Sequence, residues 1–310
     1  MRKADGVSGA TFETNSTPLS AIFCVFGAFF AFSCTDAGAK YLVLEGMQPA
    51  FASWVRFAVH MIVVAALLRI PTRPSRLRVT SLPMHILRGI LLLASGILGF
   101  SSLLTLQLVE MVSIAFAAPL VITALAGPLL GEKIGWQRWV AIMVGFGGVL
   151  VITRPGLGGL QVGHLFAGLS VLSYCFFAIM TRWMSATETE ESLLLIPAIV
   201  AVLAMLPVIP SVGSLPENAV QWCVLLALGI SGSLGHWLLL KAYRVAAASA
   251  IAPYAYLQML WTLCFGYLVF GQMPDRWTVA GSSIIVAGGL YLMHRDRKQR
   301  LAVRALPNIP

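Results

Sequence analysis

The sequence predicts an all-α integral membrane protein with ten transmembrane helices, arranged as two inverted five-helix repeats. The first reason is composition: of 310 residues, 58% are hydrophobic and only 11% are charged, whereas soluble domains carry roughly 25% charged residues. The second is a series of apolar segments of about 20 residues, the length that crosses a hydrocarbon core of about 30 Å. The third is a pattern of glycines that recurs in both halves.

The apolar segments follow one another along the whole chain. Their predicted bounds are 19–41, 49–70, 86–106, 112–130, 139–153, 164–183, 193–209, 221–242, 250–270 and 277–293. The first segment is too long for the core of a signal peptide, so we expect it to be retained. The predicted parts are an N-terminal cytoplasmic tail, a first repeat, an outer linker, a second repeat and a basic cytoplasmic tail, at 1–18, 19–154, 155–163, 164–293 and 294–310.

The net charge of +9 is distributed in a way that predicts topology. With the N-terminus in the cytoplasm, all but four of the 21 lysines and arginines fall in segments predicted to be cytoplasmic. The exceptions are Lys40, Arg154 and Arg276 in outer segments and Arg56 inside a span. Such a bias predicts that the protein lies in a bacterial inner membrane with both termini on the cytoplasmic side. The charge therefore predicts no nucleic-acid partner, and the bilayer is the expected environment.

An internal repeat is visible in the glycines. Gly131 matches Gly271, and the pair Gly147-Gly148 matches Gly288-Gly289, at a separation of about 140 residues. Each half then holds five spans, and because five is odd the second half enters the membrane from the opposite side. Inverted repeats are typical of secondary transporters, which bind their solute near the midplane between the halves.

The first two spans contain charged residues that are costly in a membrane. Asp36 and Lys40 share one helical face, and Arg56 and His60 share another. If the chain turns near 45–48, Asp36 and Arg56 lie at similar depth, so we predict that they form an intramembrane charge pair. This pair and His60 are either a structural clamp or a coupling site, since both carboxylate and imidazole can carry protons.

The second half contains a stripe of polar and aromatic residues. Tyr254, Gln258 and Trp261 stand at i, i+4 and i+7, which places a phenol, an amide and an indole on one face of a helix. His236 and Tyr243 have the same seven-residue separation on the preceding helix. These five residues are the predicted substrate-binding site, suited to a flat solute with polar edges. The alternative is that they are helix-packing contacts.

The same region carries a resemblance to a known family. The run GHWLLLKAYRVAAASAIAP from Gly235 to Pro253, with FGQMPD at 270–275, resembles the EamA family of the drug/metabolite transporter superfamily over about residues 19–295. Three further runs are similar to those of bacterial riboflavin importers of that family: DAGAKYL at 36–42, WVRF at 54–57 and APLVITALAGPLLGE at 118–132.

The resemblance implies ten helices, two inverted repeats and a central cavity that opens alternately to each side. Together with the composition it predicts a secondary transporter of a small organic metabolite, with riboflavin uptake as the specific hypothesis and export of amino acids or other metabolites as the alternative. A membrane-integral enzyme or a scaffold is a weaker alternative, because no phosphate-binding loop, H-E-x-x-H, C-x-x-C or G-x-S-x-G motif occurs. The sequence predicts no enzymatic activity, cofactor or metal, and it is compatible with a homo-oligomer.

Overall fold

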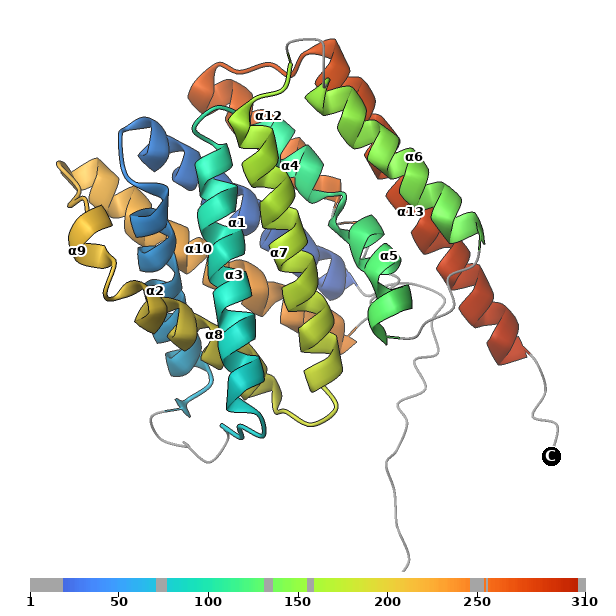
Figure 1. Cartoon of the computed structure of the whole chain (residues 1–310), viewed down its shortest axis with the longest axis horizontal. Coiled ribbons are helices and arrows are strands. Elements are labelled where there is room, and N and C mark those ends of the chain that lie inside the picture. The colour runs from blue at the N-terminus through green and yellow to red at the C-terminus, as the bar shows by residue number, and fades with distance from the viewer. Residues whose placement is uncertain are drawn as a thin grey trace, which may run out of the picture.

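The computed structural model of the chain is a bundle of helices (Figure 1). It describes residues 19–70, 77–130, 136–154, 159–245, 254 and 256–305. Within these ranges all regular secondary structure is helical, which confirms the all-α prediction. Six apolar stretches in these ranges are long enough to cross a membrane, and one of them, Leu108–Leu125, contains a turn at Phe116 and Ala117. Two shorter apolar helices are Trp139–Thr153 and Leu257–Phe270.

Each predicted segment overlaps at least one helix. The helices of the first half are α1 (Leu19–Leu44), α2 (Pro49–Leu67), α3 (Leu82–Ser102), α4 (Leu108–Ala115), α5 (Ala118–Leu130) and α6 (Trp136–Thr153). Those of the second half are α7 (Val162–Met184), α8 (Glu190–Met205), α9 (Ile209–Val212), α10 (Ala219–Val245), α12 (Leu257–Phe270) and α13 (Arg276–Ala305). The last helix therefore continues beyond its predicted end at residue 293.

The fourth predicted span differs most from its prediction, because it is two helices rather than one. The chain turns at Phe116 and Ala117, between α4 and α5. Ala117 donates its N–H to Ile114, three residues back, which tightens the end of α4. Pro119 has no N–H to donate to Ala115, so a regular helix cannot continue through this point.

The helices of the two halves interleave (Figure 1). α1 packs along α10, and α3 packs along α7. α2 also contacts α10, and α8 also contacts α3. α6 lies beside α13, α2 beside α8 and α4 beside α12. The bundle therefore buries its interior between helices from opposite halves.

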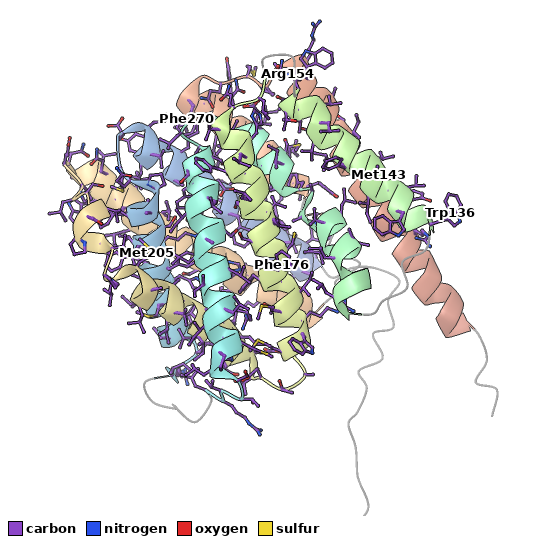
Figure 2. All side chains as sticks on the ribbon, in the orientation of Figure 1. Trp136, Met143, Arg154, Phe176, Met205 and Phe270 are labelled. Carbon is purple, nitrogen blue, oxygen red and sulfur yellow. The ribbon has the colours of Figure 1, made fainter. Side chains whose placement is uncertain are left out.

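The outer surface of the bundle is apolar, as expected where lipid replaces water. Figure 2 shows Trp136 and Met143 on the outer side of α6, where they are 73% and 64% exposed. Close helix contacts lie inside. At Gly235 of α10 an added Cβ would come within 2.6 Å of the Phe32 ring of α1, so only glycine allows this approach.

A buried lysine ties three segments together at one end of the bundle. Lys40 is 2% exposed, and its ammonium donates to the carbonyl of Leu106 at 2.6 Å, in the turn between α3 and α4. The same ammonium lies 5.8 Å from the ring centre of Phe270, at the end of α12. The charge count had placed Lys40 in an outer segment. In the structure Lys40 is buried in the helix bundle.

At the opposite end, Glu188 anchors the turn between α7 and α8 to the start of α3. Its Oε1 accepts the backbone N–H groups of Thr80 at 2.9 Å and Ser81 at 3.1 Å. Its Oε2 lies 3.4 Å from Nε2 of His85, and both side chains are buried. This carboxylate therefore joins the turn before α8 to the two residues that precede α3.

A second ion pair joins the end of α6 to the start of α13. Arg154 Nη2 lies 2.9 Å from Oδ2 of Asp275, whose Oδ1 accepts the N–H of Thr278 at 2.7 Å. Partial burial raises the pKa of Asp275, but the hydrogen bonds from Thr278 and the charge of Arg154 outweigh it, so its pKa lies below the usual range. The ionised carboxylate is therefore favoured by folding.

This ion pair gives a testable pH dependence. Asn also accepts the capping hydrogen bond, so Asp275→Asn removes mainly the charge. Because the pair is partly exposed, we expect the melting temperature of the detergent-solubilised protein to fall by only about 1–3 °C at pH 7. A group with a lowered folded-state pKa stabilises above its unfolded pKa and loses that effect as pH falls through the folded value. The difference between wild type and variant should therefore vanish in acid, and an equal difference at both pH values would contradict this account.

Candidate functional site

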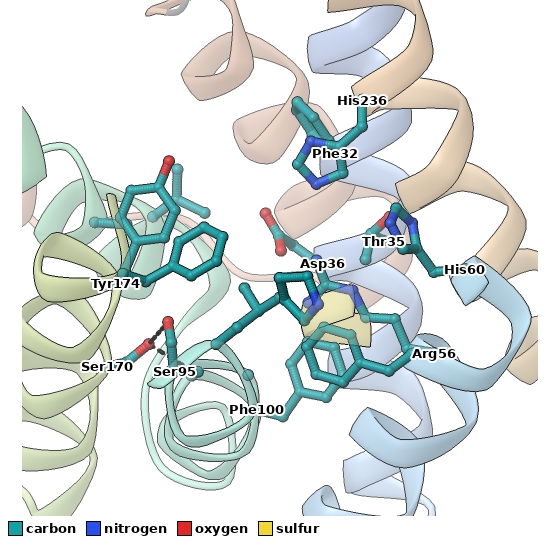
Figure 3. A pocket seen from close by; sticks show the side chains of 18 of the residues that line it. Phe32, Thr35, Asp36, Arg56, His60, Ser95, Phe100, Ser170, Tyr174 and His236 are labelled. Carbon is teal, nitrogen blue, oxygen red and sulfur yellow. Dashed lines mark hydrogen bonds between the residues drawn. The ribbon is translucent and has the colours of Figure 1, made fainter. Parts of the chain in front are cut away.

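A cavity of about 540 Å³ lies inside the bundle. Its walls come from α1, α2, α3, α4, α7, α8, α10 and α12, so both halves of the chain contribute (Figure 3). Its volume falls within the range of about 300–1,000 Å³ that small-molecule sites occupy. Five of the eight predicted site residues line it: Asp36, Arg56, His60, His236 and Gln258.

Asp36 and Gln258 meet on one side of this cavity. The Gln258 amide donates from Nε2 to Oδ2 of Asp36 at 3.0 Å, which joins α1 to the first turn of α12. The partly positive N-terminus of α12 favours a carboxylate at this position. The predicted role of Gln258 in binding a solute stays a prediction, and its amide also contacts the carboxylate of Asp36.

Arg56 reaches the same cavity from α2. Its guanidinium carbon lies 5.5 Å from the ring centres of both Phe57 and Phe100, within the range of cation–π attraction. The charges of Arg56 and Asp36 attract each other. Within the described residues, however, the two side chains form no direct ion pair, so the predicted charge pair is more open than a salt bridge.

Two histidines lie next to each other beside these charges. The rings of His60 and His236 are 5.6 Å apart, and Phe32 meets the His236 ring edge-on at 5.0 Å. Nδ1 of His60 hydrogen-bonds Ser233 Oγ at 3.1 Å, which connects α2 to α10. Figure 3 shows both imidazoles on the side of Asp36 and Arg56. A coupling role for His60 stays a prediction.

Tyr254 and Trp261 do not line the cavity. Tyr254 precedes α12 and packs against a cluster that includes Ala21 and Ala242. Trp261 is held edge-on by Phe26 and Phe30, with ring centres 5.0 Å apart in both pairs. The side chain of Tyr243 lies outside the described residues. Because α12 begins at Leu257, Tyr254 does not share a regular helical face with Gln258.

Several cavity residues were not predicted. Arg88, on α3, was assigned to a cytoplasmic segment, yet it is fully buried and lines the cavity. Ser95 and Ser170 line it as well, with Ser170 Oγ donating to the Ser95 carbonyl at 2.7 Å. Tyr174 stands beside them (Figure 3). The sequence signal that could have indicated this wall is the run of small residues Ala94-Ser95-Gly96 on α3.

The chemistry of the cavity is that of a binding site for an organic solute. It combines one carboxylate, two guanidinium groups and several aromatic rings. No cluster of metal-ligating side chains occurs among the residues that the structure describes. A helix bundle with an apolar surface and a charged internal cavity is the architecture of a membrane transporter.

Comparison with known proteins agrees with that class. The chain belongs to the EamA-like transporter family, whose model matches residues 19–154 and 161–293. The family lies within the drug/metabolite transporter superfamily, as the sequence resemblance implied. The two matched stretches correspond to two EamA repeats.

Relatives carry different solute names. An S-adenosylmethionine uptake transporter of Rickettsia prowazekii is 34% identical over 71% of this chain and 74% of its own length. A riboflavin transporter of Vibrio cholerae is 24% identical over 91% of this chain and 95% of its own length. A crystal structure with 17% sequence identity matches the fold with a TM-score of 0.59 and covers 88% of this chain and 98% of that one.

The bond between Gln258 and Asp36 gives a prediction. Gln258→Leu removes a hydrogen bond to a carboxylate in a desolvated cavity, so we expect the apparent affinity for solute to fall about five- to thirty-fold. Gln258→Glu should cost at least as much, because it places a second carboxylate beside Asp36. Transport affinity and membrane abundance are measured together. Gln48→Leu, at an exposed helix start, is the matched control and should leave affinity unaltered.

Trp261 is tested in the same assay. Its assignment to the substrate site stays a prediction, and its contacts with Phe26 and Phe30 supply the competing account. Trp261→Ala with lower affinity and normal abundance would keep it in the site. Lower abundance with unaltered affinity would make it a packing residue of the interface between α1 and α12.

Proposed function

We propose that this chain is a secondary transporter of the bacterial inner membrane that moves a small organic metabolite by alternating access. The observation that carries the proposal is the cavity that holds Asp36, Arg56 and Gln258 between the two halves. Charged side chains inside a membrane protein are costly, and they mark solute or ion pathways. The named relatives are transporters, which supports this function over an enzyme or a scaffold.

Alternating access follows from a further part of the proposal, that the chain has ten transmembrane helices in two inverted repeats. In that arrangement α1 corresponds to α7, α3 to α10 and α6 to α13. The helix contacts support this arrangement. Exchanging the two halves turns the contact of α1 with α10 into the contact of α7 with α3, and both contacts are present. The same exchange leaves the contact between α6 and α13 unchanged. Two equivalent halves can rock about a site between them and expose it to either side.

The solute that we propose first is S-adenosylmethionine, taken up into the cell. The relatives from Rickettsia with that name share 34% identity with this chain. The cavity offers a carboxylate and guanidinium groups for the charged amino-acid end of the solute and aromatic rings for its adenine.

Riboflavin is the second candidate. The Vibrio cholerae relative named for it matches 91% of this chain, and an isoalloxazine ring can stack on Phe100 or Tyr174 in the cavity. The alternative to uptake is export of amino acids or other metabolites. A pseudopaline exporter of Pseudomonas aeruginosa is 23% identical over 68% of the chain.

The solute is tested in proteoliposomes that contain the purified full-length chain. Labelled S-adenosylmethionine and labelled riboflavin are offered separately, each in competition with unlabelled forms of both. We expect saturable uptake of S-adenosylmethionine that riboflavin does not displace. Uptake of riboflavin alone would reverse the order of the candidates, and conversion of either solute to a product would contradict a transport function.

The topology gives a separate prediction. The excess of basic residues in predicted cytoplasmic segments supports both termini facing the cytoplasm. Reporter fusions after Gly271 should then read outside the cell, and fusions after Arg300 should read inside. The reverse pattern would contradict this orientation.

A further inference from the structure

The two opposite charges in the cavity define the chemical class of the solute. Resting on the proposed function, we propose that the cavity recognises the zwitterion of an amino-acid-type solute, with Arg56 binding the α-carboxylate and Asp36 binding the α-ammonium. Neither role follows from the names of the relatives, which specify no residues. It follows from which donors and acceptors in the cavity are already engaged and which are left for a solute.

Arg56 is the cation whose guanidinium N–H groups are not used by the described residues. Its guanidinium lies near the phenyl rings of Phe57 and Phe100, which attract the cation but accept no conventional hydrogen bond. Within the described residues, no protein acceptor bonds its N–H groups. An arginine held in this way presents a planar fork of donors, and a carboxylate matches that fork with two parallel hydrogen bonds.

The other cations near the cavity are already engaged. The Nε of Arg88 donates to Thr181 Oγ1 at 3.1 Å, and its Nη2 donates to the Leu193 carbonyl at 3.0 Å. The ring of Phe177 covers its face at 5.0 Å. Lys40 is bound to Leu106 away from the cavity lining. Arg56 is therefore the guanidinium that is best placed to receive an anionic group.

Asp36 complements Arg56. One of its oxygens accepts the amide of Gln258, which fixes the plane of the carboxylate. Its second oxygen has no partner among the described side chains, and the residue lines the cavity. A carboxylate in low dielectric favours a cationic donor. Gln258 is thus a positioning residue, and Asp36 is the acceptor for an ammonium group.

This arrangement distinguishes the two candidate solutes. S-adenosylmethionine carries both an α-carboxylate and an α-ammonium, whereas riboflavin carries neither. Riboflavin would leave the N–H groups of Arg56 and the second oxygen of Asp36 desolvated without a charged solute group, which is costly. The aromatic rings of the cavity can bind either solute, so they do not distinguish between them.

The test removes one charge from the solute and one from the protein. S-adenosylmethionine, its decarboxylated form and its 2-oxo form, which lacks the ammonium, compete for uptake of labelled S-adenosylmethionine into proteoliposomes. We expect wild-type protein to bind S-adenosylmethionine about tenfold more tightly than either analogue. Arg56→Gln should abolish the preference over the decarboxylated form but keep the preference over the 2-oxo form. Asp36→Asn should do the reverse, and Arg56→Lys should restore part of the carboxylate preference.

This reciprocal pattern separates recognition from a structural role. If Arg56 and Asp36 only stabilise the bundle, each variant lowers uptake of all three compounds equally, and the proposal is overturned. Arg276→Gln and Glu217→Gln remove matched charges from exposed positions and should leave every ratio at its wild-type value. Membrane abundance is measured for each variant, so that loss of protein is not mistaken for loss of affinity.

The same experiment distinguishes failure of the inference from failure of the proposed solute. Uptake of S-adenosylmethionine without the reciprocal pattern keeps the solute and overturns the roles of Arg56 and Asp36. If S-adenosylmethionine is not taken up, thermal shifts of the purified protein are measured with zwitterionic amino acids and with the corresponding amines. Stabilisation by the zwitterions alone, lost in Arg56→Gln, supports the inference with a different solute. No stabilisation by any zwitterion, or uptake of riboflavin alone, overturns it.

Discussion

The rest of the site depends on keeping Asp36 and Arg56 charged inside an apolar bundle. Each charge costs several kcal/mol to desolvate unless its surroundings compensate. The compensation comes from separate elements: the amide of Gln258 on α12 for the carboxylate, and the ring of Phe100 on α3 for the guanidinium. The two charges also attract each other without forming a direct ion pair. A direct salt bridge would have satisfied both groups and left nothing to bind a solute.

The ends of the bundle are held by a different kind of contact. At one end Lys40 donates to the Leu106 carbonyl, and at the other Glu188 accepts two N–H groups and meets His85. In both cases a charged side chain of one segment satisfies backbone groups where another helix begins or ends. Each contact therefore joins two segments of the chain at one end of the bundle.

Polar residues within spans marked the site, but their spacing described only part of it. Asp36, Arg56, His60 and His236 are conspicuous in the sequence because charged or ionisable groups are rare in membrane spans. The stripe of Tyr254, Gln258 and Trp261 was less informative, since it assumed a helix that continues through residue 254. The helix begins at Leu257, so Gln258 reaches Asp36 while Trp261 meets the rings of α1. Local spacing cannot reveal where a helix begins against its neighbours.

The sequence by itself determined that this is an all-helical membrane protein and where most of its helices run, because composition and segment length are properties of the chain alone. Its family was indicated by a resemblance in the run from Gly235 to Pro253 and at 270–275. Only the tertiary structure decided which polar groups face one another. It broke the fourth predicted span at Phe116 and buried Arg88, which the charge count had assigned to a cytoplasmic segment. It also placed Asp36 and Arg56 in the wall of one cavity. These outcomes depend on the packing of helices far apart in the sequence, and no local pattern encodes such contacts.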